Sequence, residues 1–174
     1  MKKLFFATII ILIGSTAAYA QSDKKEESME KRSWLKLGVD LGVPVGNASN
    51  VSSFVAGLEL KGQIMETEHV GFGLTAAYEN YFAKSGFDNF GAIPLGAFLR
   101  LYPNHQGFFA GVDAGYGIVT SSGAEGGFYL KPQLGYHNYN WNVFGYFDNV
   151  FRSTSDGGNI GNVGIGATYN IRFK

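Results

Sequence analysis

The residue types that most often carry catalysis are few in this chain and stand apart from one another. There is no cysteine, which excludes a thiolate nucleophile, a thiolate metal site and a disulfide framework. The three histidines, His69, His105 and His137, do not have the spacing of a metal-binding motif. The expected external connections contain several serines but no histidine, so no base is at hand to activate these serines. We therefore expect no catalytic, cofactor-binding or metal site, and no enzymatic activity.

The charged side chains are the other group that could do chemistry. The chain has 14 basic and 14 acidic residues, and this balance gives no electrostatic reason to expect nucleic acid as a partner. Only 16% of the residues are charged, whereas about 25% is usual. Five basic and five acidic residues stand out because each interrupts a regular apolar pattern: Lys36, Asp40, Glu59, Lys61, Glu79, Arg100, Asp113, Lys131, Asp148 and Arg172.

The pattern that positions these charges has a period of two. Apolar residues occupy every second position in eight segments: 35–45, 54–64, 70–79, 92–101, 108–118, 128–136, 141–148 and 163–173. Alternation of this kind predicts β-strands with two different faces. The connections are short and rich in Gly, Asn and Ser, which favours antiparallel hairpins. The sequence thus predicts an all-β fold, an eight-stranded antiparallel up-and-down β-barrel. Pro132 interrupts one segment, and we expect a local bulge there.

The composition of the second face indicates which side of the barrel meets water. A lipocalin-like soluble barrel would place its apolar face inside, whereas a transmembrane barrel places that face against lipid. Glycine is the commonest residue of the second face, which also carries the ten balanced charges, and this composition favours an enclosed interior over a solvated surface. Segments of about ten residues also suit a strand that crosses a bilayer. We therefore predict a transmembrane barrel whose charges and remaining aromatic rings fill the lumen.

Aromatic residues are expected to form two belts at the membrane interfaces. The belt at the end nearer the N-terminus is predicted to contain Trp34, Tyr102, Phe108, Tyr136, Trp141 and Phe173. The belt at the other end is predicted to contain Phe54, Tyr81, Phe82, Phe87, Phe90, Phe128 and Phe151.

The N-terminal residues have the pattern of an export signal. A basic start, an apolar run over 4–13 and the sequence Ala18-Tyr19-Ala20 predict a cleavable signal peptide over 1–20; an N-terminal anchor helix is the alternative. The polar, mixed-charge stretch 21–33 is predicted to be a flexible periplasmic lead-in. The barrel is expected to span 34–174.

From 34 to 174 the chain resembles the small outer-membrane β-barrels, the OmpA-transmembrane-domain and OmpX-like superfamily that is sometimes labelled the porin family. Strand number and alternation carry the resemblance, together with the last strand, in which Tyr169, Ile171 and Phe173 alternate. The resemblance implies that this strand is an assembly signal, although a lysine follows Phe173 here. It also implies the partners: outer-membrane lipid and lipopolysaccharide, periplasmic chaperones and the outer-membrane assembly machinery. An external partner stays open.

These observations predict a protein of the cell outer membrane, exported by a cleavable signal peptide. Its expected role is structural or one of surface interaction, without catalysis and without a cofactor, with a side-chain-filled and charge-neutralised lumen. A narrow gated channel for ions or small solutes is one alternative. A soluble periplasmic lipocalin-like lipid carrier is another.

Overall fold

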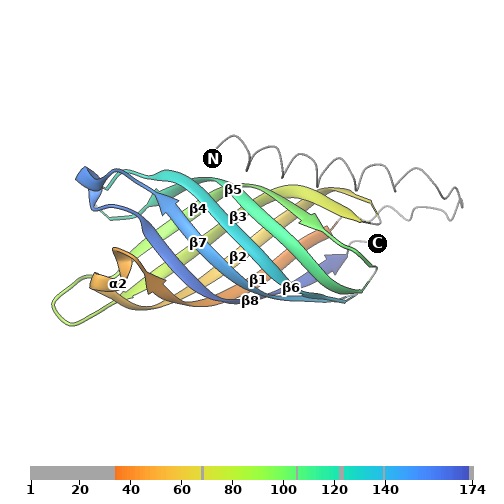
Figure 1. Ribbon diagram of the computed structural model, residues 1–174, viewed down its shortest axis with the longest axis horizontal. Helices are drawn as coiled ribbons and strands as arrows, with labels where there is room; N and C mark the ends of the chain where they lie inside the picture. The colour runs from red at the N-terminus through yellow and green to blue at the C-terminus, as the bar shows by residue number, and fades with distance from the viewer. Residues whose placement is uncertain (1–33, 68, 105, 122–123, 139, 173–174) are drawn as a thin grey trace, which may run out of the picture. The chain divides into compact units, whose positions relative to one another are not determined.

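The computed structural model describes residues 34–67, 69–104, 106–121, 124–138 and 140–172 (Figure 1). The predicted signal peptide over 1–20 and the lead-in over 21–33 lie outside the described residues, as does Phe173 of the expected assembly signal.

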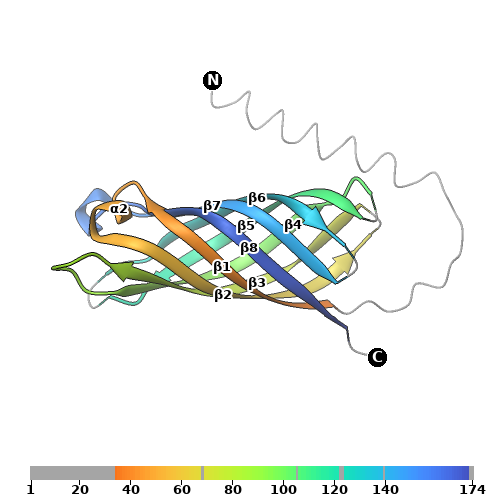
Figure 2. The ribbon, with the colours of Figure 1, turned by 90° about the horizontal axis from the view of Figure 1, so that it is seen from below.

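Eight antiparallel strands close into a barrel (Figures 1 and 2). They are β1 Trp34–Val45, β2 Ser52–Glu66, β3 Val70–Ala83, β4 Phe90–Leu101, β5 Gly107–Val119, β6 Gly127–His137, β7 Trp141–Phe151 and β8 Ile160–Arg172. Each strand pairs with the next along the chain, and β1 pairs with β8 to complete the ring. The predicted up-and-down barrel is therefore confirmed.

Two short helices mark one end of the barrel. They are α2 (Ala48–Val51), between β1 and β2, and the 3-10 helix η1 (Thr154–Asp156), between β7 and β8. Figure 2 shows α2 at the end opposite to the one where β8 finishes. We call the end with α2 the outer end and the other the inner end. Neither helix in the described parts of the chain has the length and apolar character needed to cross a membrane.

Pro94 in β4 and Pro132 in β6 leave the register of their strands unchanged. The prediction of a bulge at Pro132 is wrong: pairing with β5 is continuous, and the β6–β7 register is the same on both sides of a gap opposite Lys131 and Pro132. A similar gap lies between β3 and β4 beside Pro94. Proline keeps an extended backbone but has no backbone N–H to donate. Inter-strand hydrogen bonds are therefore lost beside it, but no extra residue is inserted into the strand. The register shifts occur instead in the β2–β3 pair, near Ser52 and near Gln63.

The barrel has the inverse of a water-soluble distribution of side chains. Large apolar side chains point outward and are among the most exposed, with Leu58 60%, Leu134 72% and Phe108 78% exposed. Charged side chains of the same strands are buried; Lys61, on β2 like Leu58, is 0% exposed. Successive residues of a strand face opposite sides of the sheet. The alternation of apolar and polar residues therefore places the apolar side chains of each strand outside the barrel and the charged ones inside.

Candidate functional site

The lumen is the part of the barrel where chemically active side chains meet. Nine of the ten charged residues singled out from the sequence have described side chains, and all nine are buried. Eight of them form what we call the ionic layer: Asp40, Glu59, Lys61, Glu79, Arg100, Asp113, Lys131 and Asp148. The ninth, Lys36, donates a hydrogen bond to Asn170 Oδ1 at 3.2 Å. The side chain of Arg172 lies outside the described set.

Lys131 on β6 is the centre of the ionic layer. Its Nζ lies 2.5 Å from Asp40 Oδ2, 3.4 Å from Glu59 Oε2 and 3.7 Å from Glu79 Oε1. It also lies 4.3 Å from the ring centroid of Tyr146, which adds a cation–π contact. One ammonium group thus holds three carboxylates that come from three different strands.

Lys61 on β2 extends this network across the lumen. Its Nζ lies 2.5 Å from Asp113 Oδ2 and 3.2 Å from Glu59 Oε1. Gln133 Nε2 donates a further hydrogen bond to Asp113 Oδ2 at 2.9 Å. Because Glu59 contacts both Lys61 and Lys131, the ion pairs form one continuous chain between β5 and β1.

Arg100 is held by aromatic rings. Its guanidinium carbon lies 4.8 Å from the ring centroid of Phe109 and 5.5 Å from that of Phe144. One terminal nitrogen donates to Gln133 Oε1 at 3.3 Å, and among the described residues no carboxylate pairs with it. Stacking on aromatic faces suits the planar guanidinium and offsets part of the cost of burying this charge. Its Nε and Nη1 have no hydrogen-bond partner among the described residues.

Asp148 on β7 is the unusual member of the ionic layer. Its side chain is 0% exposed, and no N–H or O–H group of the described residues donates to either carboxyl oxygen. Its nearest interaction is with another carboxyl group, that of Glu79. The facing residue on β8 is Asn162, which directs its amide nitrogen to Glu79 Oε2 at 3.1 Å and to the Tyr81 hydroxyl at 2.9 Å. The ionic layer has five carboxyl groups against three cations, and Asp148 is the carboxyl that forms no ion pair among the described residues.

We expect Asp148→Asn to raise the free energy of unfolding by about 1–2 kcal/mol, because a buried polar group without a partner costs about that much. The new amide can donate to Asn162 Oδ1, which is also unpartnered. The urea midpoint of the barrel in detergent micelles measures the effect. Asp113→Asn is the matched control, since Asp113 has two donors and should lose stability. A loss of stability in Asp148→Asn equal to that in Asp113→Asn would contradict the expectation.

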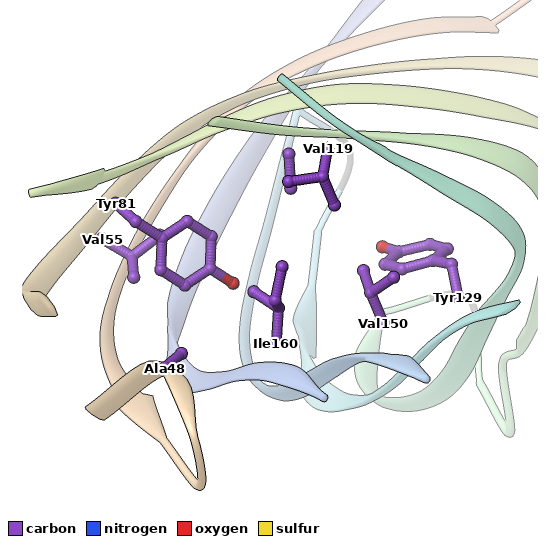
Figure 3. Close-up of a cluster of buried hydrophobic side chains, with 8 residues drawn as sticks. Ala48, Val55, Tyr81, Val119, Tyr129, Val150 and Ile160 are labelled. Carbon is purple, nitrogen blue, oxygen red and sulfur yellow. The ribbon is translucent and has the colours of Figure 1, made fainter. Parts of the chain in front are cut away.

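Apolar groups close the outer end of the lumen. The outer plug consists of Ala48, Val55, Tyr81, Ala92, Val119, Tyr129, Val150 and Ile160. Figure 3 shows the labelled members of this cluster pointing into the barrel, with Ala48 contributed by α2. Tyr81 is 0% exposed, so its expected place in an aromatic belt is wrong, and Phe90 packs against the plug as well. The alternation of β3 explains the error, since Tyr81 shares the inward phase of Glu79.

A second set of rings lies on the inner side of the ionic layer. We call Tyr102, Phe109, Phe144 and Tyr146 the inner aromatic cluster. Along β7, Phe144 and Tyr146 precede Asp148, and Val150 of the outer plug follows it, so three layers succeed one another along the lumen. Tyr102, expected in an aromatic belt, is 6% exposed and lies in this cluster instead.

Unlike Tyr81, Phe90 and Tyr102, the other belt residues with described side chains lie on the surface of the barrel. The following are exposed: Phe54, Phe82, Phe87, Phe108, Phe128, Tyr136, Trp141 and Phe151. The side chains of Trp34 and Phe173 are outside the described set.

Two of the histidines, at the inner end of the barrel, lie within hydrogen-bond distance of backbone carbonyl oxygens. His69 Nδ1 lies 3.0 Å from the Tyr102 carbonyl oxygen, and His137 Nε2 lies 3.1 Å from that of Asn104. His105 lies outside the described residues. In the described ranges no three His, Asp or Glu side chains are arranged to hold a metal ion.

The last strand has the outward alternation expected of it. Tyr169 is exposed and packs against Trp141 with a centroid distance of 4.9 Å, while Ile171 is half-buried. The inward face of β8 carries polar residues that were not predicted as site residues from the sequence. Asn170 and Thr168 both bond the amide of Asn142, with lengths of 2.9 and 3.1 Å. The only sequence feature that could have identified them is their place on the polar side of the alternation, which faces the lumen.

A closed eight-stranded barrel with apolar residues outside and charges inside is the form of a small transmembrane β-barrel. Comparison with solved structures supports this class. The Yersinia pestis outer membrane protein Ail in a phospholipid bilayer nanodisc matches with a TM-score of 0.54 and 11% identity, over 80% of this chain and 99% of that one. The N-terminal β-barrel domain of Pseudomonas aeruginosa OprF matches with a TM-score of 0.50 and 12% identity, over 80% and 98%.

A de novo designed transmembrane β-barrel matches as well, with a TM-score of 0.51 and 12% identity over 82% of this chain and 98% of that one. No protein-family model matches the sequence, and no curated protein does either. The resemblance to the small outer-membrane β-barrels is therefore confirmed at the level of the fold.

Proposed function

We propose that this protein is an integral β-barrel of the cell outer membrane with a structural or surface-interaction role and no catalytic activity. The sidedness of the barrel carries the proposal. Eight charged groups occupy the interior with at most 1% exposure, while the outer wall presents leucine, valine and aromatic side chains. An exposed apolar wall of this extent needs lipid around it, because soluble proteins rarely expose large apolar patches.

The same observation argues against a soluble lipid carrier. A lipocalin-like carrier holds its ligand in an apolar cavity inside the barrel. Here the middle of the lumen is a network of ion pairs centred on Lys131. Cell fractionation separates the two functions: a membrane barrel stays with the envelope and needs detergent, whereas release by osmotic shock alone would support the carrier. Heat-modifiable migration in a detergent gel checks that the extracted protein is a folded barrel.

The three layers of side chains support the proposal that the lumen is closed. The outer plug and the inner aromatic cluster consist of aliphatic side chains and aromatic rings, not of the rings of carbonyl or charged groups that line an ion pathway. Within the ionic layer, Lys131 is held by three carboxylates at once, so exchanging one partner leaves two in place.

We expect the purified barrel to give no stable single-channel steps in a planar bilayer, since all three layers obstruct the lumen. A heat-denatured sample at the same detergent concentration is the control for artefacts. Reproducible steps that require folded protein would support the gated channel instead.

The expected partners follow from the same proposal. A barrel of this kind is surrounded by outer-membrane lipid and lipopolysaccharide, and it reaches the membrane through periplasmic chaperones and the outer-membrane assembly machinery. The outward alternation of Tyr169 and Ile171 is consistent with the assembly signal proposed for the last strand. Folding yield of the full chain on purified assembly machinery, compared between wild type and Tyr169→Ser, tests that signal.

A further inference from the structure

Asp148 on β7 and Glu79 on β3 are two carboxyl groups of the ionic layer that contact each other. In the ring of strands, three strands lie between β3 and β7 in either direction, so these side chains come from opposite walls of the barrel. Both are buried, with exposed fractions of 0% for Asp148 and 1% for Glu79. The contact between them therefore crosses the lumen at the level of the ionic layer.

The two carboxyl groups differ in their hydrogen-bond partners. Glu79 Oε2 accepts one bond from Asn162 Nδ2 at 3.1 Å and one from the Tyr81 hydroxyl at 3.5 Å. Lys131 Nζ lies 3.7 Å from Glu79 Oε1. Asp148, in contrast, receives no hydrogen bond at either oxygen from the described residues. Glu79 thus has the surroundings of an ionised carboxylate, whereas Asp148 lacks the donors that stabilise a negative charge.

The other ionisable groups around Asp148 do not supply a second cation. Besides Glu79, the groups that act on its carboxyl are Asp40 on β1, Tyr81 on β3, Tyr129 and Lys131 on β6, and Tyr146 on β7. Lys131 is the cation of this set, and its ammonium already lies within 3.7 Å of three other carboxylates. A tyrosine hydroxyl is ordinarily neutral at physiological pH. An ionised Asp148 would therefore face the negative charges of Glu79 and Asp40.

We propose that Asp148 and Glu79 bind one proton between them, with the Asp148 carboxyl protonated and donating a hydrogen bond to Glu79. Two buried carboxylates in contact do not both keep their charge, because their repulsion adds to the cost of taking each of them out of water. The proton removes one of the two charges and replaces the repulsion by a hydrogen bond between β3 and β7. This contact across the lumen then depends on pH.

A bound proton makes the stability of the barrel fall as the pH rises. An aspartic acid in an unfolded chain loses its proton at about pH 4, so above about pH 5 the folded barrel holds one proton more than the unfolded chain. We expect the unfolding equilibrium constant of the wild type to rise about tenfold for each pH unit relative to that of Asp148→Asn, until the pair itself loses its proton. The asparagine amide donates to Glu79 without taking up a proton, so this variant lacks the dependence. Urea unfolding in detergent micelles between about pH 6 and about pH 9 measures the difference.

Infrared spectroscopy detects the proton directly, because a protonated carboxyl group has a carbonyl stretching band that a carboxylate lacks. The full chain is folded in a detergent without ester groups and measured at about pH 8, where exposed carboxyl groups are ionised. We expect this band in the wild type and its loss in Asp148→Asn. Glu79→Gln should lose it as well, because the new amide donates to an ionised Asp148. Asp113→Asn is the matched control: Asp113 is also 0% exposed but is paired with Lys61, so the band should remain.

Four results would overturn the proposal. The first is the absence of the protonated carboxyl band from the folded wild type. The second is a band that persists in Asp148→Asn, which would place the proton on another carboxyl group. The third is an equal dependence of stability on pH in the wild type and in Asp148→Asn. The fourth is stabilisation of the wild type, but not of Asp148→Asn, by millimolar sodium or calcium at alkaline pH, which would make a metal cation the ligand of the pair.

Folding of each variant is scored by heat-modifiable migration before its spectrum is recorded. If Glu79→Gln does not fold, the comparison of Asp148→Asn with Asp113→Asn and the wild type still decides, since Asp148→Asn is expected to be more stable than the wild type.

Discussion

Replacing Lys131 with methionine will lower the free energy of unfolding by about 3–5 kcal/mol, the usual cost of removing one partner from a buried ionic network. Methionine has a similar length but no charge, so Asp40, Glu59 and Glu79 would lose the ammonium group that lies within 3.7 Å of all three. Glu59 keeps Lys61 as a partner, whereas no other ion pair is present for Asp40 or Glu79 among the described residues.

The urea dependence of folding in detergent micelles or thin liposomes measures this loss. Lys84→Met is the matched control, because it removes an exposed lysine at the outer end and should change stability little. Adding Asp40→Asn to Lys131→Met should recover part of the lost stability, since one unpaired carboxylate is then gone. Unchanged unfolding in Lys131→Met would show that the ionic layer contributes nothing to stability.

Leu58→Arg will impair assembly by about 2–4 kcal/mol, the cost of an arginine on the lipid face of a barrel near the bilayer midplane. Leu58 stands near the middle of β2, is 60% exposed, and pairs with Val39 on β1 and Tyr78 on β3, which also face outward. The folded fraction in liposomes, read from heat-modifiable migration, measures the effect.

Two substitutions separate the causes of this effect. Leu58→Ala removes apolar surface without adding charge and should cost less than Leu58→Arg. Ser53→Arg places the same charge on an exposed position near the outer end of β2, where the expected cost falls to about 0–1 kcal/mol. If Leu58→Arg folded as well as Ser53→Arg, the outward face of the barrel would not lie against lipid.

The sequence alone determined the number of strands, their order and the phase of each. These features depend on local chemistry: alternation with a period of two chooses a face for each residue, and short Gly- and Asn-rich connections force neighbouring strands to be antiparallel. The alternation alone therefore assigns Lys61 and Leu58 to opposite faces of β2. The bulge expected at Pro132 was wrong because a proline can drop ladder bonds without shifting the register.

Only the tertiary structure decided which groups meet inside and outside the barrel. The choice of Asp40 as a partner of Lys131, across 91 positions of sequence, depends on how far the strands are staggered when the ring closes. The same stagger leaves Asp148 without an ion pair or a donor among the described residues and brings Asn47 to the connection between β7 and β8. Period-two alternation contains no information about stagger, because every residue keeps its face when a strand slides by two positions.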